Sequence, residues 1–237
     1  MCKKEFRYQL KLTKLNELKF LSHLDWQNLI LKSLRRAGVH FALSEGFNKV
    51  PKISFSPALP LFISSECELV NFITTEPLAD DFKESFKMAA PENLKIIDIK
   101  KLENDGRRMV SLDNLVQWAS YEAEIPEDNV VNKMLGISNF EDLRYTVEKC
   151  LSSSDFFIEK KTKKGILKQI NYRNSIKTMD VSDGRLVFVL KTGQDDTLPA
   201  LRADEFLKCL MKKFTDKEAI FEIKRLSFFD KDMTEIL

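Results

Sequence analysis

The segment around His23 contains the residues whose types and spacing could do chemistry. Ser22-His23-Leu24-Asp25 has the S-x-x-D form of a capping box, in which side chains satisfy the first amide groups of a helix. At a helix N-terminus the dipole favours the neutral imidazole, which could accept a proton or bind a ligand group. The alternative for His23 is a first-turn residue whose ring packs or hydrogen-bonds locally. Asp25 faces the same choice, and capping is its simplest role.

Arg35 and Arg36 stand in the last turn of the same helix, where cations interact favourably with the dipole. That interaction accounts for both arginines without any ligand. They also belong to an uneven charge distribution, since residues 1–55 hold eleven Lys and Arg against four acids, whereas residues 56–150 hold ten against eighteen. A basic block is typical of proteins with phosphate-bearing partners, although a solvated face without a partner fits equally well.

The segment 44–52 is a second candidate for a binding role. Gly46 and Asn48 tolerate left-handed backbone angles, and Lys49 and Lys52 flank the ring of Phe47. A turn that combines an aromatic ring with two cations suits contact with phosphate or nucleic acid. An ordinary solvated hairpin has the same composition, so both interpretations stay open.

The spacing of apolar residues predicts an α+β protein. Alternation predicts a strand over 6–12, and the apolar stripe after Ser22 predicts a helix that Gly38 ends. The elements expected next are strands over 41–43, 53–55, 61–64 and 67–75, a helix over 78–89 and a strand over 94–99. Their order is β-α-β-β-α-β with additions, which is the ferredoxin-like, or split βαβ, plan.

The second half repeats this order of elements. Expected there are a strand over 116–125, helices over 130–135 and 140–151, strands over 156–158, 166–172 and 186–190, a helix over 206–214 and a strand over 220–228. The polar segment 103–108, with a glycine inside it, separates the halves. We therefore predict two ferredoxin-like domains, 1–102 and 109–237, each an antiparallel sheet with helices on one face.

The absence of several motifs narrows the range of chemistry that the chain could carry out. The chain has no C-x-x-x-C-x-x-C motif for an iron–sulfur cluster and no glycine-rich phosphate loop. Its cysteines, Cys2, Cys67, Cys150 and Cys209, are scattered, and its two histidines form no zinc constellation. We expect no metal and no cofactor, and a protein that works by binding a partner. No apolar run approaches the roughly 20 residues of a membrane helix, so we expect a cytoplasmic protein without membrane contact.

Three blocks of sequence, taken together, resemble one protein family. They are Phe20-Leu21-Ser22-His23-Leu24-Asp25, Arg35-Arg36-Ala37-Gly38, and Gly46-Phe47-Asn48 followed by Pro51-Lys52-Ile53-Ser54-Phe55. In that order and spacing they resemble the radical SAM-linked protein family, a domain of unknown function found beside, or fused to, bacterial radical SAM proteins. The resemblance is dense over residues 6–78. Further along the chain, Arg173 and Arg202 match two later arginines of the family. Lys49 and His40 replace usual prolines, and Phe62 replaces a glycine.

The resemblance implies a context rather than a reaction. Members are often encoded near an RNase E/G-type ribonuclease and ribosomal protein genes, which implies an RNA or ribosome setting. The leading hypothesis is a non-catalytic accessory protein that holds such a substrate for a radical SAM enzyme. One alternative is an endoribonuclease-like enzyme with His23 as general acid or base, helped by Lys49, Lys52 or Arg36. Another is a purely protein-binding scaffold that docks the enzyme through the acidic middle of the chain.

The candidate residues of the first half are expected to meet on one surface. A helix that packs antiparallel to its flanking strands returns the chain to its starting end, so the next hairpin can fold back towards the helix N-terminus. Arg35 and Arg36 fit least well, because a fourteen-residue helix is about 21 Å long and places them at its far end. The residues expected to meet are His23, Asp25, Arg35, Arg36, Gly46, Phe47, Asn48 and Lys52. Lys49, Arg173 and Arg202 complete the set of candidate binding residues.

Overall fold

The computed structural model describes residues 5–124, 140–161, 165–182, 184–193, 198–212 and 221–236. The helix expected over 130–135 lies outside these residues, as do Cys2 and the last residues of the helix expected over 206–214. The chain forms two compact units, one of Met1–Val116 with Ser227–Leu237 and one of Gln117–Leu226. The polar segment 103–108, at which the sequence analysis divided the chain, therefore lies inside the first unit.

The first unit is built on an antiparallel sheet. Its strands are β1 (Phe6–Lys14), β2 (Ile53–Phe55), β3 (Ser64–Thr74) and β4 (Ile96–Leu102). β1 pairs with β4 and with β3, and β3 also pairs with β2. Because Phe72 of β3 lies opposite both Tyr8 of β1 and Ile53 of β2, these two strands occupy opposite sides of β3. The strand order is therefore β4-β1-β3-β2.

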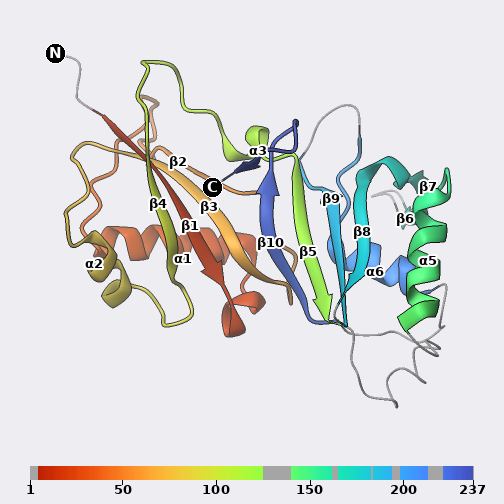
Figure 1. Cartoon of the computed structure of the whole chain (residues 1–237). Helices are drawn as coiled ribbons and strands as arrows, with labels where there is room; N and C mark the ends of the chain where they lie inside the picture. Colours follow the sequence, from red (N-terminus) through yellow and green to blue (C-terminus); the bar gives the residue numbers. More distant parts are fainter. Residues whose placement is uncertain are drawn as a thin grey trace. The chain divides into compact units, whose positions relative to one another are not determined.

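Short connections and helices complete the first unit. They are η1 (Asn16–Phe20), α1 (His23–Arg36), α2 (Phe82–Ala89), α3 (Leu112–Leu115) and the short strand β11 (Glu235–Ile236), which pairs with the end of β10 (Ile223–Phe229). Helices α1 and α2 lie on the same face of the β4-β1-β3 strands (Figure 1). None of the helices in the described residues is long and apolar enough to cross a membrane.

Alternation along β1 gives the sheet of this unit one apolar and one polar face. Tyr8, Leu10 and Leu12 are buried in a cluster with Trp26 and Ile30 of α1 and with Phe82 and Phe86 of α2. The side chains between them point the other way, and there Gln9 donates a 2.8 Å hydrogen bond to Asn71 of β3. The polar face is thus itself buried and hydrogen-bonded rather than left to solvent.

Two strands expected in the first unit differ in the structure. The segment 41–43 makes only isolated bridges, Phe41 with Thr74 and Leu43 with Pro51. The strand expected over 61–64 is wrong, because β3 begins at Ser64 and Leu61 and Phe62 form a turn. Phe62 has a φ of +69°, a left-handed backbone angle that an extended strand cannot contain.

The second unit holds further antiparallel strands. Its elements are β5 (Trp118–Glu124), α5 (Phe140–Ser152), β6 (Phe157–Lys161), β7 (Leu167–Asn171), η2 (Arg173–Ser175), β8 (Ile176–Ser182), β9 (Arg185–Lys191), α6 (Ala203–Met211) and most of β10. The strand order is β10-β5-β9-β8, and β6 and β7 form a separate hairpin. The α+β prediction is confirmed in both units.

Strand β8 was not predicted from the sequence. Its register against β9 shifts between Ile176 and Thr178, so the alternation of apolar and polar side chains is interrupted there. Without that alternation the segment lacks the two-residue period by which a half-buried strand is recognised.

Candidate functional site

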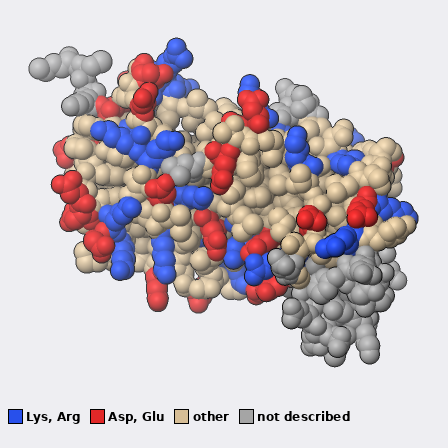
Figure 2. Space-filling model, viewed as in Figure 1, with Lys and Arg blue, Asp and Glu red and all other residues tan. Residues whose placement is uncertain are grey.

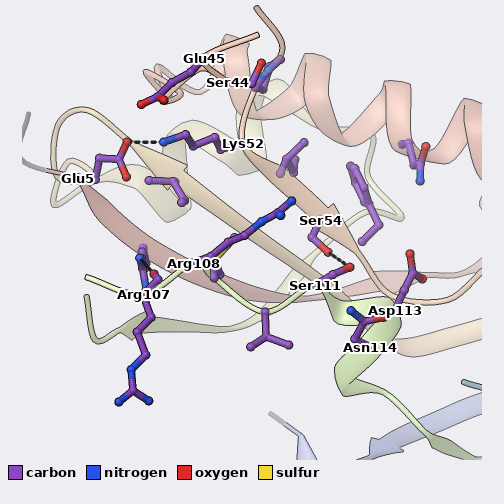
Figure 3. Close-up of a pocket in the computed structure, with 18 of the residues that line it drawn as sticks. Glu5, Ser44, Glu45, Lys52, Ser54, Arg107, Arg108, Ser111, Asp113 and Asn114 are labelled. Atoms are coloured by element: carbon purple, nitrogen blue, oxygen red, sulfur yellow. Dashed lines mark hydrogen bonds and ion pairs between the residues drawn. The ribbon is translucent and has the colours of Figure 1, made fainter. Parts of the chain in front are cut away.

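A cavity of 1340 Å³ lies beside β2 in the first unit (Figure 3). One wall comes from His23 and Gln27 of α1, and the opposite wall from the segment 106–111 with Asp113 and Asn114. The residues between the walls are Glu5, Arg7, Ser44, Glu45, Pro51, Lys52, Ile53, Ser54, Phe55 and Ile73. We call this cavity the edge groove, because β2 ends the strand order of the unit.

His23 is positioned in the edge groove by its own helix. Its ring Nε2 lies 2.8 Å from the side-chain nitrogen of Gln27, one turn further along α1. An amide nitrogen can only donate, so Gln27 donates and the His23 Nε2 accepts. The histidine is half-buried and is held at the groove wall by Gln27.

The capping box predicted at the start of α1 is present. The Ser22 hydroxyl accepts a 3.2 Å hydrogen bond from the Asp25 amide and donates to the Asp25 carboxylate at 2.6 Å. Asp25 therefore serves the helix end and does not line the groove. Arg35 and Arg36 occupy the last turn of α1 and do not line it either.

The tip of the loop between Ser44 and Val50 does not line the cavity. Ser44 closes the loop, because its amide donates to the Val50 carbonyl at 2.8 Å and its hydroxyl accepts from the Val50 amide at 3.1 Å. Phe47 at the tip is fully exposed. The three residues around it, Gly46, Asn48 and Lys49, are also exposed, and none of them lines the groove. Neither Gly46 nor Asn48 adopts the left-handed backbone that the sequence analysis associated with this turn.

Lys52 lines the edge groove but is already ion-paired. Its ammonium group lies 2.7 Å from the Glu5 carboxylate (Figure 3). Of the residues expected to meet on one surface, His23 and Lys52 therefore share the groove, and Asp25, Arg35, Arg36, Gly46, Phe47 and Asn48 do not line it.

The segment 103–111 contributes to the groove in a way that was not predicted from the sequence. Its first residues are fixed by Arg7 of β1, whose guanidinium lies 3.5 Å from the Asp105 carboxylate and donates to the Arg107 carbonyl. Arg7 is only 8% exposed, and its Nε has no hydrogen-bond partner among the described residues. The segment predicted to separate the two halves is thus tied to the first strand, and its continuation forms a wall of the groove.

Two neighbouring arginines in this wall point in different directions. Arg108 directs its guanidinium into the groove, whereas Arg107 extends away from it (Figure 3). Arg107 pairs with Asp105 at 3.6 Å and has an 89% exposed side chain. Arg108 makes no hydrogen bond or ion pair within the described part of the chain. It is therefore a cation of the groove that is available to a ligand.

The two candidate arginines of the second unit have structural partners. Arg173 donates to the carbonyls of Ser153 at 3.0 Å and Ile176 at 3.2 Å, and also to the Leu151 carbonyl in the last turn of α5. Arg202 makes two hydrogen bonds to Asp204, at 3.0 and 2.7 Å. The hydrogen bonds to Asp204 raise the pKa of Arg202. Neither arginine lines the edge groove.

On the face drawn in Figure 2, Lys and Arg side chains are interspersed with Asp and Glu rather than gathered into one basic patch. In the described ranges, no group of three or more His, Cys, Asp and Glu side chains could hold a metal ion.

The first unit thus combines an antiparallel α+β fold with a groove beside β2. Residues 7–200 match the family model described as an uncharacterized protein conserved in bacteria (DUF2344). The chain belongs to this family. The family description names no radical SAM enzyme, so that part of the resemblance stays a proposal. No curated protein matches the chain.

Proposed function

We propose that the protein is a cytoplasmic, non-catalytic accessory protein that holds an RNA or ribosome-related substrate for a radical SAM enzyme. The observation that carries the proposal is the edge groove with Arg108 directed into it. At 1340 Å³ the groove exceeds the roughly 300–1,000 Å³ of typical small-molecule sites, which suits a segment of a polymer. The sequence resemblance supplies the enzyme partner and the setting.

We also infer that each unit is a split βαβ domain. In the first unit the elements β1, α1, β2, β3, α2 and β4 form strands in the order β4-β1-β3-β2. In the second unit β5, α5, β8, β9, α6 and β10 follow one another, with the β6–β7 hairpin inserted, and the strand order is β10-β5-β9-β8. The same succession and the same order support a common plan.

The endoribonuclease alternative draws support from one observation, which is that His23 and Lys52 line the same groove. The other assistants considered for His23, Lys49 and Arg36, do not line it, and Lys52 is occupied by Glu5. A histidine held by Gln27, with Lys52 already paired to Glu5, supports binding rather than cleavage. Incubation of structured RNAs with the purified protein tests this, and cleavage that Ala in place of His23 abolishes would establish the enzyme.

Salt titration of RNA binding tests the proposed function. With a fluorescent single-stranded RNA of mixed sequence as probe, we expect affinity to fall as salt rises, because phosphate contacts release counterions. Arg108→Ala should reduce the salt slope by about one unit, and Arg107→Ala should leave it unchanged. Purification from the native host should recover a radical SAM protein with the chain. The proposal would be wrong if RNA binding changed neither with salt nor with Arg108→Ala and if no radical SAM protein were recovered.

A further inference from the structure

The main chain of β2 itself faces the edge groove. Five consecutive residues, 51–55, line the cavity. Side chains of a strand alternate between its two faces, so one face alone would contribute every second residue. A continuous run means that the cavity follows the edge of the strand, with α1 on one side and the segment 106–111 on the other.

The hydrogen bonds beside β2 show which of its main-chain groups point outward. The Ile73 amide donates to the Lys52 carbonyl at 3.0 Å, and the Ser56 amide donates to the Leu69 carbonyl at 2.9 Å. Between these two pairs, Ile53, Ser54 and Phe55 lie opposite Phe72, Asn71 and Val70. Antiparallel pairs alternate between hydrogen-bonded and non-bonded positions. Ser54 therefore bonds to β3, and the N–H and C=O groups of Ile53 and Phe55 point towards the groove.

We propose that the edge groove binds an extended polypeptide segment, which adds to β2 as a further strand and places an acidic side chain against Arg108. Strand addition requires an unpaired edge and a space beside it, and both meet at β2 in the described part of the chain. The inference deepens the proposed function and rests on it, because it names the bound part of a ribosome-related substrate as protein.

The chemistry of the groove favours polypeptide over RNA. The outward groups of Ile53 and Phe55 are two donors and two acceptors. The phosphates of RNA offer acceptors only, so partners for the two carbonyls would have to come from its 2′-hydroxyls or bases. A polypeptide supplies both kinds of group at the two-residue spacing of a strand. The cations suit one anionic group rather than a row of them, since Glu5 neutralises Lys52 and Arg7 is held by Asp105. Arg108 remains for a single carboxylate.

The test uses the full chain and defined peptides. The probes are acetylated five-residue peptides of alternating Thr and Val with every amino acid in turn at the centre, each supplied up to about 1 mM. We expect NMR shifts of the Ile53 and Phe55 amides, with the Asp and Glu peptides binding best. Methylation of the alternate peptide nitrogens that face β2 should weaken binding at least about tenfold. It removes the N–H groups that would donate to the carbonyls of Ile53 and Phe55. Arg108→Ala should abolish the preference for an acidic centre, and Arg107→Ala should keep it.

A parallel titration with oligouridylate distinguishes a failure of strand addition from a failure of the proposed function. If RNA shifts the groove amides and no peptide does, the groove binds its substrate as proposed and strand addition is wrong. If neither probe shifts them, both proposals fail. Peptides that bind equally well with and without methylated nitrogens would also overturn strand addition, because main-chain pairing would then contribute nothing.

Discussion

Nη1 of Arg7 lies 3.5 Å from Oδ1 of Asp105, although the two residues stand 98 positions apart in the chain. The pair joins the first strand to the segment that follows β4. Because that segment continues into the wall that carries Arg108, the position of the free guanidinium depends on a contact made far from it in sequence.

Replacement of Asp105 by Ala should destabilise the first unit. The change leaves a buried guanidinium with one partner fewer, and we expect a loss of about 1–3 kcal/mol in the free energy of unfolding. Urea denaturation measures it. Glu92→Ala is the matched control, since Glu92 is exposed and has no hydrogen bond or ion pair within the described chain. Equal stabilities of the two variants would show that the Arg7 contact contributes nothing.

Replacing Phe62 by Gly should leave the protein more stable than replacing it by Ala, which is the reverse of the order found within a helix. Its left-handed φ of +69° strains any residue with a Cβ atom, and its ring is 65% exposed. We expect Phe62→Gly to be more stable than Phe62→Ala by about 1 kcal/mol in thermal or urea unfolding. At Met88, an exposed position in α2, Gly should instead be less stable than Ala by about 1 kcal/mol. The same order at both positions would contradict the strain argument.

The amide groups of β2 should exchange with solvent at different rates. Ser54 is hydrogen-bonded to β3, whereas the Ile53 and Phe55 amides face the groove. Hydrogen exchange followed by NMR should therefore show Ser54 protected at least about tenfold more than its two neighbours. Uniform protection across 53–55 in the free protein would mean that the edge is already paired, and the basis of strand addition would be lost.

Lys160 of β6 should stabilise the second unit in a pH-dependent way. Burial lowers its pKa, but hydrogen bonds and attraction from Glu205 and Tyr172 outweigh burial, so the pKa lies above the ordinary 10.5. A raised pKa means that the stabilisation is complete below pH 10.5 and is lost as pH rises through the folded value. Lys160→Met should cost about 0.2–1 kcal/mol at neutral pH, because the 2.7 Å pair is partly exposed.

To check the role of Lys160, the urea midpoints of the unchanged protein and of the Lys160→Met variant are compared at neutral pH and at about pH 11. The difference should shrink at the higher pH, where the ammonium group of the native protein loses its proton. Glu205→Gln serves as the control from the other partner and should show a similar loss at neutral pH. A difference that stays constant with pH would assign the effect to lost packing.

Local features of the fold could be predicted from the sequence, and contacts between distant segments could not. The cap made by Ser22 and Asp25 and the buried stripe of α1 follow from spacing within one helix. The strand β8 was missed because an irregular register interrupts its period, and the turn at Phe62 was missed because a phenylalanine gives no signal for a left-handed angle. Arg108 was missed because its segment is placed by Arg7, which no local pattern connects to it.

The return of residues 227–237 to the first unit has a consequence for the order of folding during synthesis. β11 pairs with the end of β10, and Glu235 lies 3.8 Å from Lys11 of β1, so a residue of the first strand is joined by one that is made after the second unit. All of Gln117–Leu226 is translated between them. A nascent chain can form the strands and helices up to α3 early, but it acquires this final contact only after the inserted unit has left the ribosome.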